Sequence, residues 1–367
     1  MNILQLTTNF LPGGIQRHVL DLTADLRSRG HQVTLAGDSG DWAEPGTVLL
    51  PLNRVTWRGG NAAKRLAALW PCVRQLRATV RKRGVQLIHA HETAPTIVAR
   101  LATLGLRVPV LFTFHGSAPA REAGVARVSR ACATITVSPS RDGVERLVGH
   151  GVPCSRCRVL GLGIPPLAQV PEADVAALRA QLLGGRDGPL IMSLSRLDPQ
   201  KGIDVMIAVA RRVVERFPGV VFAVGGKGPL ADRVEGWARD AGVAQAVRFM
   251  GMVSTVPAHL RAADLFLLTS RWENRPISIV EAFGAGLPVV ATDCGGVREL
   301  VDDRVGALVP VNDPEEIAAA LIALLSDPER MRQSGQAALA RSRSAAFDPH
   351  SVHAQFEALY REVLGRK

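Results

Sequence analysis

Short apolar runs alternate with amphipathic segments along the whole chain. The strands expected from these runs are residues 2–6, 32–36, 86–90, 108–114 and 134–137 in the first half, and residues 190–194, 220–224, 247–249, 264–268 and 289–292 in the second. Continuous apolar runs of this length, with helical patterns between them, are typical of buried parallel strands. The pattern therefore predicts an α/β protein with a parallel sheet in each half.

Length and a local change in composition predict two domains. A chain of 367 residues is long for one hydrophobic core and sufficient for two. Residues 161–172, GLGIPPLAQVPE, are rich in Gly and Pro, as connecting segments are. We therefore expect a first domain at residues 1–165, a linker region at 166–186 and a second domain at 187–349.

Two glutamates flank the start of one predicted helix in the second half. Glu273 follows the apolar run 264–268, and Glu281 lies in the helix that begins near Pro276, where proline suits the first helical position. Open parallel sheets bind ligands at the carboxyl ends of their strands, and a helix amino terminus attracts phosphate. The segment therefore predicts half of a nucleoside diphosphate site, in which a carboxylate can accept hydrogen bonds from a ribose diol.

The Glu-x7-Glu spacing resembles the signature of retaining glycosyltransferases of family 4. Further matches occur in the family's order, namely Gly13-Gly14, Arg196 and Lys201 in SLSRLDPQKG, residues 225–229 (GGKGP) and residues 248–252 (RFMGM). The resemblance implies the GT-B architecture, in which two Rossmann-like domains with parallel sheets face each other. It also implies that the C-terminal helix, residues 350–367, returns to the first domain, which binds the acceptor, while the second domain binds the nucleotide sugar.

The resemblance also implies roles for individual residues. The catalytic set is His115, Arg196, Lys201 and Glu273. The donor-binding set is Gly13, Gly14, Gly226, Met250, Asn274, Arg275, Pro276, Ile277 and Glu281. Arg196 and Lys201 would neutralise the departing diphosphate, and the sequence has no Asp-x-Asp, so neither a metal nor another cofactor is expected. The implied reaction retains anomeric configuration, and no enzyme nucleophile is evident.

Net positive charge is confined to the first half of the chain. Residues 1–165 contain 21 Lys or Arg and 9 Asp or Glu, whereas the remainder contains 23 and 24. Residues 54–83 contain nine basic residues and no acidic residue, along an apolar helical stripe that we expect to be broken or kinked at Pro71. This basic face suits an anionic membrane surface, with Trp57 and Trp70 as interfacial anchors.

Several residues of the first half are predicted to contact an acceptor or a membrane, Gln16 and His18 because they lie beside Gly13-Gly14 and the others because of this basic charge. These are Gln16, His18, Arg58, Lys64, Arg65, Arg81 and Lys82. The predicted reaction moves a sugar from a UDP- or GDP-sugar to a membrane-associated or anionic, lipid-linked glycan acceptor, in cell-envelope polysaccharide, lipopolysaccharide or glycolipid synthesis. The chain shows neither a signal peptide nor an apolar run of roughly 20 residues. We expect a cytoplasmic enzyme, peripheral on the cytoplasmic face of the inner membrane.

Alternatives remain open at this point. The same fold can serve a soluble acceptor, or a sugar-nucleotide epimerase or binder, and two carboxylates can be the catalytic pair of a glycosidase. Nucleic acid is a rival polyanion, but only 4% of residues are aromatic and no recognition motif is present. Cys154 and Cys157 form a C-x-x-C that we expect to be two cysteines in a loop. His89, His91 and Glu92 resemble a metal cluster, but alternating strand residues point to opposite faces.

Two segments depart from the usual family pattern. Gly161-Leu162-Gly163-Ile164 replaces a common Asn-Gly-Val-Asp, and Asn274-Arg275-Pro276-Ile277 replaces the usual Phe-Gly after the first glutamate. Lys227 adds a positive charge where an acidic or small polar residue is more usual. Because the second change affects backbone near the sugar, it bears on which sugar is transferred, and Arg275 is expected to contact donor or acceptor.

Overall fold

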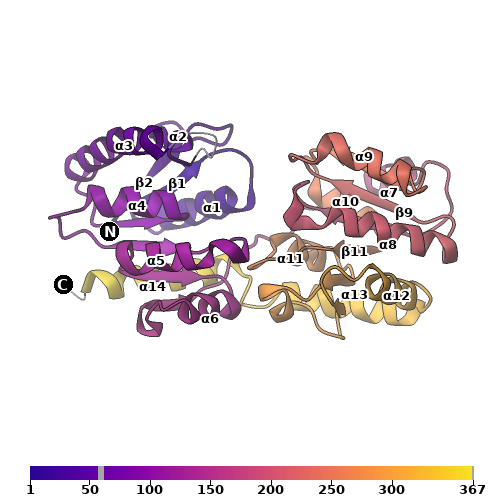
Figure 1. Cartoon of the computed structure of the whole chain (residues 1–367). Coiled ribbons are helices and arrows are strands. Elements are labelled where there is room, and N and C mark those ends of the chain that lie inside the picture. Colours follow the sequence, from indigo (N-terminus) through magenta and orange to yellow (C-terminus); the bar gives the residue numbers. More distant parts are fainter. Residues whose placement is uncertain (57–61, 366–367) are drawn as a thin grey trace. The chain divides into compact units, whose positions relative to one another are not determined.

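The computed structural model describes residues 1–56 and 62–365, and the chain divides into two compact units (Figure 1). The first unit comprises Met1–Gly163 and the C-terminal segment from Ala345, and the second comprises Ile164–Ser344. The predicted linker region, 166–186, is instead largely the helix α7 (Glu172–Leu183), which packs against α10 (Val256–Ala262) of the second unit. Its acidic first turn and its buried Val175 and Leu182 explain why it is helical.

The first unit is built on a seven-stranded parallel sheet with the order β3-β2-β1-β4-β5-β6-β7. Its strands are β1 (Asn2–Asn9), β2 (Gln32–Asp38), β3 (Val48–Leu49), β4 (Leu87–Ala90), β5 (Val110–Thr113), β6 (Ile135–Ser138) and β7 (Cys157–Val159). The predicted apolar runs form the five central strands. The edge strands β3 and β7 were not predicted, because each is only two or three residues long and partly exposed.

Helices cover both faces of this sheet. They are α1 (Gly14–Ser28), α2 (Leu52–Thr56), α3 (Ala62–Arg83), α4 (Thr93–Ala102), α5 (Glu122–Cys132), α6 (Arg141–Gly149) and α14 (Pro349–Gly365). One core joins apolar side chains of α2, α3 and α4 to the sheet, and another joins α1 and α14 to it. Val352, Phe356 and Tyr360 of α14 pack beside Ile3 and Leu87, so the predicted return of the C-terminal helix to the first domain is confirmed (Figure 1).

Two local predictions for the first unit need correction. The predicted break at Pro71 does not occur: the helix α3 continues through it, with Pro71 exposed and the following Cys72 and Leu76 buried against the sheet. The C-x-x-C does not lie in a loop: Cys154 begins a short 3₁₀ helix, and Cys157 is buried at the start of β7.

The second unit repeats the scheme with a six-stranded parallel sheet in the order β10-β9-β8-β11-β12-β13. Its strands are β8 (Leu190–Leu194), β9 (Val221–Gly225), β10 (Val247–Gly251), β11 (Leu265–Leu268), β12 (Val289–Thr292) and β13 (Gly306–Val309). Its further helices are α8 (Ile203–Arg216), α9 (Ala231–Asp240), α11 (Ile277–Gly284), α12 (Pro314–Leu325), α13 (Pro328–Ser342) and the 3₁₀ helices η3 (Pro199–Lys201) and η4 (Gly295–Glu299). The predicted α/β fold with two parallel sheets is confirmed.

Both sheets reverse their strand order beside the first strand of the unit. In the first unit the reversal lies between β1 and β4, and in the second between β8 and β11. Loops after two such strands diverge to opposite faces of a sheet and leave a crevice, where doubly wound folds bind nucleotides. The fold therefore directs attention to the loops that follow β1, β4, β8 and β11.

Candidate functional site

In the second unit, predicted donor residues follow the two strands at which the order reverses. Arg196 and Lys201 lie in the loop and 3₁₀ helix after β8, and residues 273–277 lie in the loop after β11. Lys201 and Glu273 are 72 residues apart in the sequence, yet they form an ion pair. Their side chains are only 14% and 7% exposed. The structure thus brings two of the four predicted catalytic residues into direct contact.

Glu273 is held by more than this cation. The hydroxyl of Ser270 donates a hydrogen bond of 2.7 Å to its Oε1. The hydroxyl of Thr269 donates to the carbonyl oxygens of Lys201, at 2.9 Å, and Gly202, at 3.0 Å. These bonds fix the end of β11 against the 3₁₀ helix that carries Lys201. A cation and a carboxylate so placed can contact a phosphate and a sugar hydroxyl with little rearrangement.

Two further residues connect the same loops, and sequence reasoning missed both. The guanidinium of Arg271 donates to Asp204 at 2.6 and 3.1 Å and to the carbonyl of Pro199 at 2.8 Å. The Gln200 amide donates to the carbonyl of Trp272 at 2.8 Å. Arg271 also holds the pKa of Asp204 below its usual value, although burial acts in the opposite direction. The only signal for Arg271 in the sequence is its position just after a buried strand.

Arg196 differs from Lys201 because it remains accessible. Its side chain is 72% exposed and lies 2.9 Å from a carboxylate oxygen of Asp198. Asp198 also accepts a hydrogen bond from the backbone of Gln200 at 3.1 Å, which caps the 3₁₀ helix. An exposed guanidinium at the entrance of this loop can form paired hydrogen bonds to phosphate oxygens. Arg196 thus pairs with an acidic residue of its own loop.

The helix α11 presents its amino terminus beside Glu273. Pro276 is its N-cap and makes no side-chain cap bond, and Ile277 is its first residue. Glu281 lies one turn further along and is partly exposed. Backbone N–H groups at such a terminus favour an anion. Thus Ile277 and Glu281 lie in one helix, as predicted, and Pro276 is its N-cap rather than its first residue.

The segment that departs from the family pattern faces inward. Asn274 is 2% exposed, and Arg275 lies 3.8 Å from a carboxylate oxygen of Glu299 in η4. Burial lowers the pKa of Arg275, and Glu299 partly offsets this effect. Arg275 therefore has an acidic partner, Glu299, within its own unit. The sequence predicted that Arg275 contacts donor or acceptor and did not indicate this partner.

Gly226 directly follows β9, and Met250 lies in the neighbouring strand β10. Gly226 has a φ of +150°, and a Cβ there would lie 1.8 Å from the carbonyl oxygen of Ser195. The glycine is thus required by close packing between the loops after β8 and β9. Met250 is partly exposed in β10.

In the first unit, the predicted residues lie after β1, after β5 and in α1. Gly13 is the N-cap of α1, with Gly14 the first residue and Gln16 partly exposed in the first turn. His115 follows β5 and is partly exposed. Burial lowers the pKa of His115 to about 3, so its imidazole is neutral at pH 7. A neutral ring can exchange hydrogen bonds with a hydroxyl group without adding charge to the site.

His18 is buried, which differs from the acceptor contact predicted for it. Its ring centroid lies 5.8 Å from that of His115 and 5.5 Å from that of Phe356. Burial, with smaller contributions from neighbouring histidines, lowers its pKa well below the usual value. The helical period explains the position, because His18, Val19 and Leu22 share the face of α1 that packs on the sheet.

His89 in β4 and His91 just after it point the same way, so the predicted separation of these two rings by strand alternation is wrong. The two rings are 4.0 Å apart, since residues two apart in a strand point the same way. Glu92 lies beyond the strand, at the N-cap of α4. Glu92 turns elsewhere and accepts hydrogen bonds from the backbone N–H of Thr8 at 2.7 Å and the hydroxyl of Thr7 at 3.1 Å. Glu92, the N-cap residue of α4, thereby ties the start of α4 to the end of β1.

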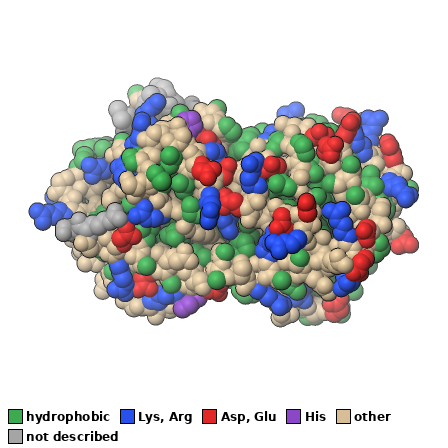
Figure 2. Space-filling view, turned by 90° about the horizontal axis from the view of Figure 1, so that it is seen from below, with side chains coloured by type: hydrophobic (Ala, Val, Ile, Leu, Met, Phe, Trp, Pro, Cys, Tyr) green, Lys and Arg blue, Asp and Glu red, His purple; other side chains and the backbone are tan. Residues whose placement is uncertain are grey.

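Four of the five basic residues predicted to meet an acceptor or membrane belong to α3, namely Lys64, Arg65, Arg81 and Lys82. Lys64, Arg81 and Lys82 are exposed, while Arg58 and the side chain of Arg65 lie outside the described residues, as does Trp57. Trp70 of α3 is 63% exposed. On the face shown in Figure 2, acidic and basic side chains are interspersed over the second unit. An acid-free surface is thus a property of α3 rather than of the whole chain.

A cavity of about 710 Å³ lies between α2 and α3. It is lined by Pro51, Asn53, Arg54, Lys64, Ala67, Ala68 and Pro71. Small apolar side chains form much of its wall, and two cations belong to its lining. Across residues 1–56 and 62–365, no helix combines the length and hydropathy of a membrane span.

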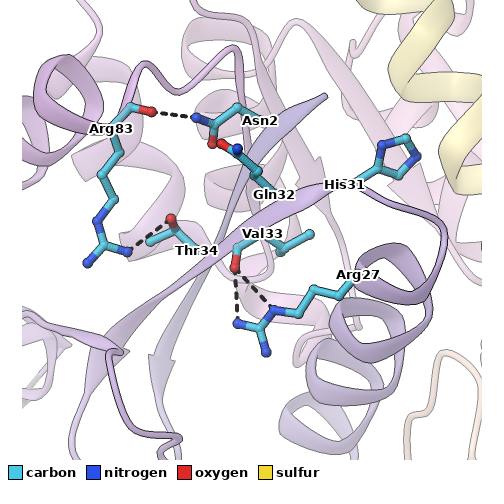
Figure 3. Close-up of a pocket in the computed structure, with 7 residues that line it drawn as sticks. All are labelled: Asn2, Arg27, His31, Gln32, Val33, Thr34 and Arg83. Carbon is cyan, nitrogen blue, oxygen red and sulfur yellow. Dashed lines mark hydrogen bonds between the residues drawn. The ribbon is translucent and has the colours of Figure 1, made fainter.

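A second cavity, of about 500 Å³, lies at the opposite, amino-terminal end of β1 and β2 (Figure 3). Arg27 there donates to the carbonyl of Val33 at 3.0 and 3.3 Å and pairs with Glu44 at 2.6 Å. Arg83 donates to the hydroxyl of Thr34 at 3.2 Å. Both arginines bind groups of the unit itself, and the cavity lies away from the strand ends where such folds bind ligands.

Comparison with known proteins shows the family to which the chain belongs. Residues 12–166 match the model of Glycosyltransferase Family 4, and residues 174–341 match that of Glycosyl transferases group 1. A phosphatidyl-myo-inositol mannosyltransferase of Mycolicibacterium smegmatis is 30% identical over 374 residues, covering 97% of this chain and 92% of the relative. The chain belongs to glycosyltransferase family 4.

Other family relatives and solved structures agree on the architecture. A phosphatidyl-myo-inositol mannosyltransferase of Mycobacterium leprae is 29% identical over 374 residues, covering 96% of this chain and 94% of the relative. Sucrose-phosphate synthase from Thermosynechococcus elongatus matches with a TM-score of 0.85 at 22% identity, covering all of both chains. Anabaena HepE in complex with UDP and glucose matches with a TM-score of 0.84 at 20% identity, covering 99% of this chain and 100% of HepE. The predicted family and GT-B fold are confirmed, and the protein is a glycosyltransferase.

Proposed function

We propose that this family 4 glycosyltransferase moves a sugar from a nucleoside diphosphate sugar to an anionic lipid-linked acceptor at the cytoplasmic face of a membrane. The observation that carries this proposal is the surface of α3, where exposed Lys64, Arg81, Lys82 and Trp70 occur in a helix without acidic residues. Each basic side chain near an anionic bilayer contributes about 1 kcal/mol, and an exposed indole favours the interface.

The donor end of the proposal rests on the second unit. A glycosidic bond that loosens leaves negative charge on the diphosphate, which must be stabilised where it develops. Arg196 is exposed for paired phosphate contacts, Lys201 supplies a point charge fixed by Glu273, and α11 supplies the backbone N–H groups of its first turn. These groups do what a divalent ion does in other transferases, so the proposed reaction requires no metal.

The proposed stereochemistry follows from the same groups. A leaving phosphate held on the donor side can accept the proton of the acceptor hydroxyl as that hydroxyl attacks the same face of the sugar. Glu273 is assigned to hydroxyl groups of the transferred sugar and Glu281 to the ribose diol. The product then keeps the anomeric configuration of the donor, and no covalent sugar intermediate forms on the protein.

Relatives guide the choice of substrates to test. A Mycolicibacterium smegmatis relative, 27% identical over 91% of this chain, is a GDP-mannose-dependent alpha-(1-6)-phosphatidylinositol monomannoside mannosyltransferase. The first donor to test is therefore GDP-mannose, with UDP-glucose beside it because HepE was crystallised with UDP-glucose. The first acceptor is phosphatidylinositol, whose phosphate matches the cations of α3.

The test incubates the full chain with GDP-mannose or UDP-glucose and with vesicles of phosphatidylcholine that contain or lack phosphatidylinositol. We expect glycolipid only with phosphatidylinositol, undiminished by EDTA, and with the anomeric configuration of the donor by NMR. Arg196→Ala should lower turnover by about 10- to 100-fold, as loss of a charge-assisted contact does. Arg239→Ala, at an exposed position of α9, is the matched control and should not.

Other outcomes would overturn parts of the proposal. Transfer to water-soluble sugars in preference to lipid would refute the acceptor class. Conversion of the free donor to an epimer without transfer would refute the assigned reaction. Activity that disappears with EDTA would refute metal independence, and full activity of Arg196→Ala would refute the assignment of the phosphate site.

A further inference from the structure

A chain of hydrogen bonds runs through the interior of the first unit and ends at His115. Its contacts are Gln5 Nε2 to Tyr360 Oη (3.2 Å), Tyr360 Oη to His89 Nδ1 (2.6 Å), His89 Nε2 to Thr113 Oγ1 (2.7 Å), Gln5 Oε1 to His91 Nε2 (2.8 Å) and His91 Nδ1 to His115 Nε2 (3.3 Å). Every member except His115 is fully buried. Tyr360 comes from α14, Gln5 from β1, His89 from β4 and Thr113 from β5, and the other two histidines follow β4 and β5.

Each member of this chain has a fixed number of protons to donate. Burial raises the pKa of Tyr360, so its hydroxyl stays protonated and donates one hydrogen bond. Burial lowers the pKa of His89 to about 3 and that of His91 well below its usual value, so both rings are neutral. A neutral imidazole donates from one nitrogen and accepts at the other. The direction of one bond therefore determines the direction of the next.

The amide of Gln5 sets that direction. Its nitrogen donates to Tyr360, whose single proton then goes to Nδ1 of His89. Its oxygen accepts from Nε2 of His91, which leaves Nδ1 of His91 without a proton. Nδ1 of His91 can then only accept, and it accepts from Nε2 of His115. An inverted Gln5 amide would reverse every one of these bonds and place the proton of His115 on Nδ1.

We infer that Tyr360, Gln5 and His91 are positioning residues that hold His115 in the tautomer with its proton on Nε2 and a bare Nδ1. Within the described residues, Nδ1 of His115 has no hydrogen-bond partner, and His115 is partly exposed. The bare nitrogen accepts a hydrogen bond from a hydroxyl group of the sugar substrate. This inference rests on the proposed function only in taking His115 to contact that substrate.

The hydrogen-bond chain depends on the hydroxyl of Tyr360, a residue separated from Gln5 by 355 positions in the sequence. Without its hydroxyl, the Gln5 amide loses the acceptor for its nitrogen and can take either orientation. Phe356 lies one turn earlier in α14, and its ring centroid is 5.5 Å from those of His18 and His89. It shares the packing environment of Tyr360 but makes no hydrogen bond, so Phe356→Leu is a matched control.

The experiment records ring ¹⁵N spectra of the full chain labelled at histidine, with His115 assigned from its absence in His115→Gln. Wild-type protein should give a bare-nitrogen shift for Nδ1 and a protonated-nitrogen shift for Nε2. Tyr360→Phe and Gln5→Leu should give averaged or doubled shifts, whereas Phe356→Leu should keep the wild-type pattern. In sugar transfer, the kcat of Tyr360→Phe should fall by up to about tenfold, because a neutral hydrogen bond contributes a free energy of that size. The KM for the donor should change little.

Two results would overturn the inference. One is an unchanged tautomer of His115 in both Tyr360→Phe and Gln5→Leu, whatever their stability. The other is an equal change in Phe356→Leu, since packing rather than hydrogen bonding would then control the ring. The spectra are recorded without substrate, so they test the tautomer of His115 independently of sugar transfer. Full transferase activity of His115→Gln would refute only the proposed role of His115 in transfer.

Discussion

The turn between η3 and α8 depends on Gly202, and we expect Gly202→Ala to disturb the ion pair of Lys201 and Glu273. Gly202 has a φ of +61°, and a Cβ at this position would lie 2.2 Å from the carbonyl oxygen of Thr269. Gly242 offers a matched control, because its φ is +73° but no atom lies within 4 Å of the added Cβ. Both variants adopt the same disfavoured conformation, and only the first meets a neighbouring backbone.

The difference between the two variants can be estimated from this contact. The left-handed conformation costs roughly 1–2 kcal/mol for any residue with a Cβ, and this term is common to both. The clash at residue 202 must open from 2.2 Å to at least 3.0 Å, and the rigid backbone of Thr269 cannot rotate away. Overpacking of this kind costs about 1–3 kcal/mol more. We therefore expect a total loss of about 2–5 kcal/mol for Gly202→Ala and about 1–2 kcal/mol for Gly242→Ala.

The same displacement should weaken donor binding. Lys201 precedes Gly202 directly, and the hydroxyl of Thr269 bonds the carbonyls of both residues. A displacement near 1 Å in such a site can lower activity by about 100-fold. Urea unfolding and calorimetric titration with GDP and UDP would measure the two effects. If Gly202→Ala is no less stable than Gly242→Ala and binds nucleotide equally well, the clash and the role of this turn are both refuted.

Three further changes test other parts of the structure. Lys201→Met should destabilise the second unit by about 3–5 kcal/mol, because it removes the cation paired with the buried Glu273. In thermal unfolding, the double variant Lys201→Met with Glu273→Gln should regain part of the lost stability. The pKa of His89 is about 3 in the folded chain, below the value near 6.5 of an unfolded histidine. The contribution of neutral His89 to folding stability is therefore full above pH 6.5 and decreases as the pH falls. At pH 5 the free energy of unfolding should be lower by about 2 kcal/mol. Melting curves from pH 5 to 8 should therefore have a shallower pH dependence in His89→Gln, and an identical dependence would contradict the assigned burial. Reversing two charges with Arg81→Glu and Lys82→Glu should weaken binding to anionic vesicles by at least about tenfold in co-sedimentation, and unchanged binding would remove α3 from the proposed membrane surface.

The central strands were predictable because they are buried on both faces. Residues 190–194 and 289–292 are strands with the predicted bounds, β8 and β12, and both are runs of apolar residues inside a sheet. The edge strands β3, β7 and β13 were not predicted. They are two to four residues long, and their pairing with a neighbouring strand rather than their own composition makes them strands.

The candidate donor site was predictable as far as its motifs extend. Lys201 and Glu273 each lie in a recognisable segment, and the fold brings the two segments together because β8 and β11 are neighbours in the sheet. Arg271 and Gln200, which join the same loops, lie in these segments too, but a side chain that bonds a backbone carbonyl leaves no pattern in sequence. Specific contacts between loops depend on register and backbone geometry, which a motif does not contain.

The histidines of the first unit show a different limit. His89 and His91 stand two residues apart in sequence, which already places both rings on one face of a strand. Their role depends on Gln5, which is the register partner of His89 in β1, and on Tyr360 in the last helix. Sequence could indicate which residues line this face, but the location of each proton follows from hydrogen bonds across 355 residues of chain. The tautomer of His115 is therefore a property of the folded first unit, and it requires α14 to be in place.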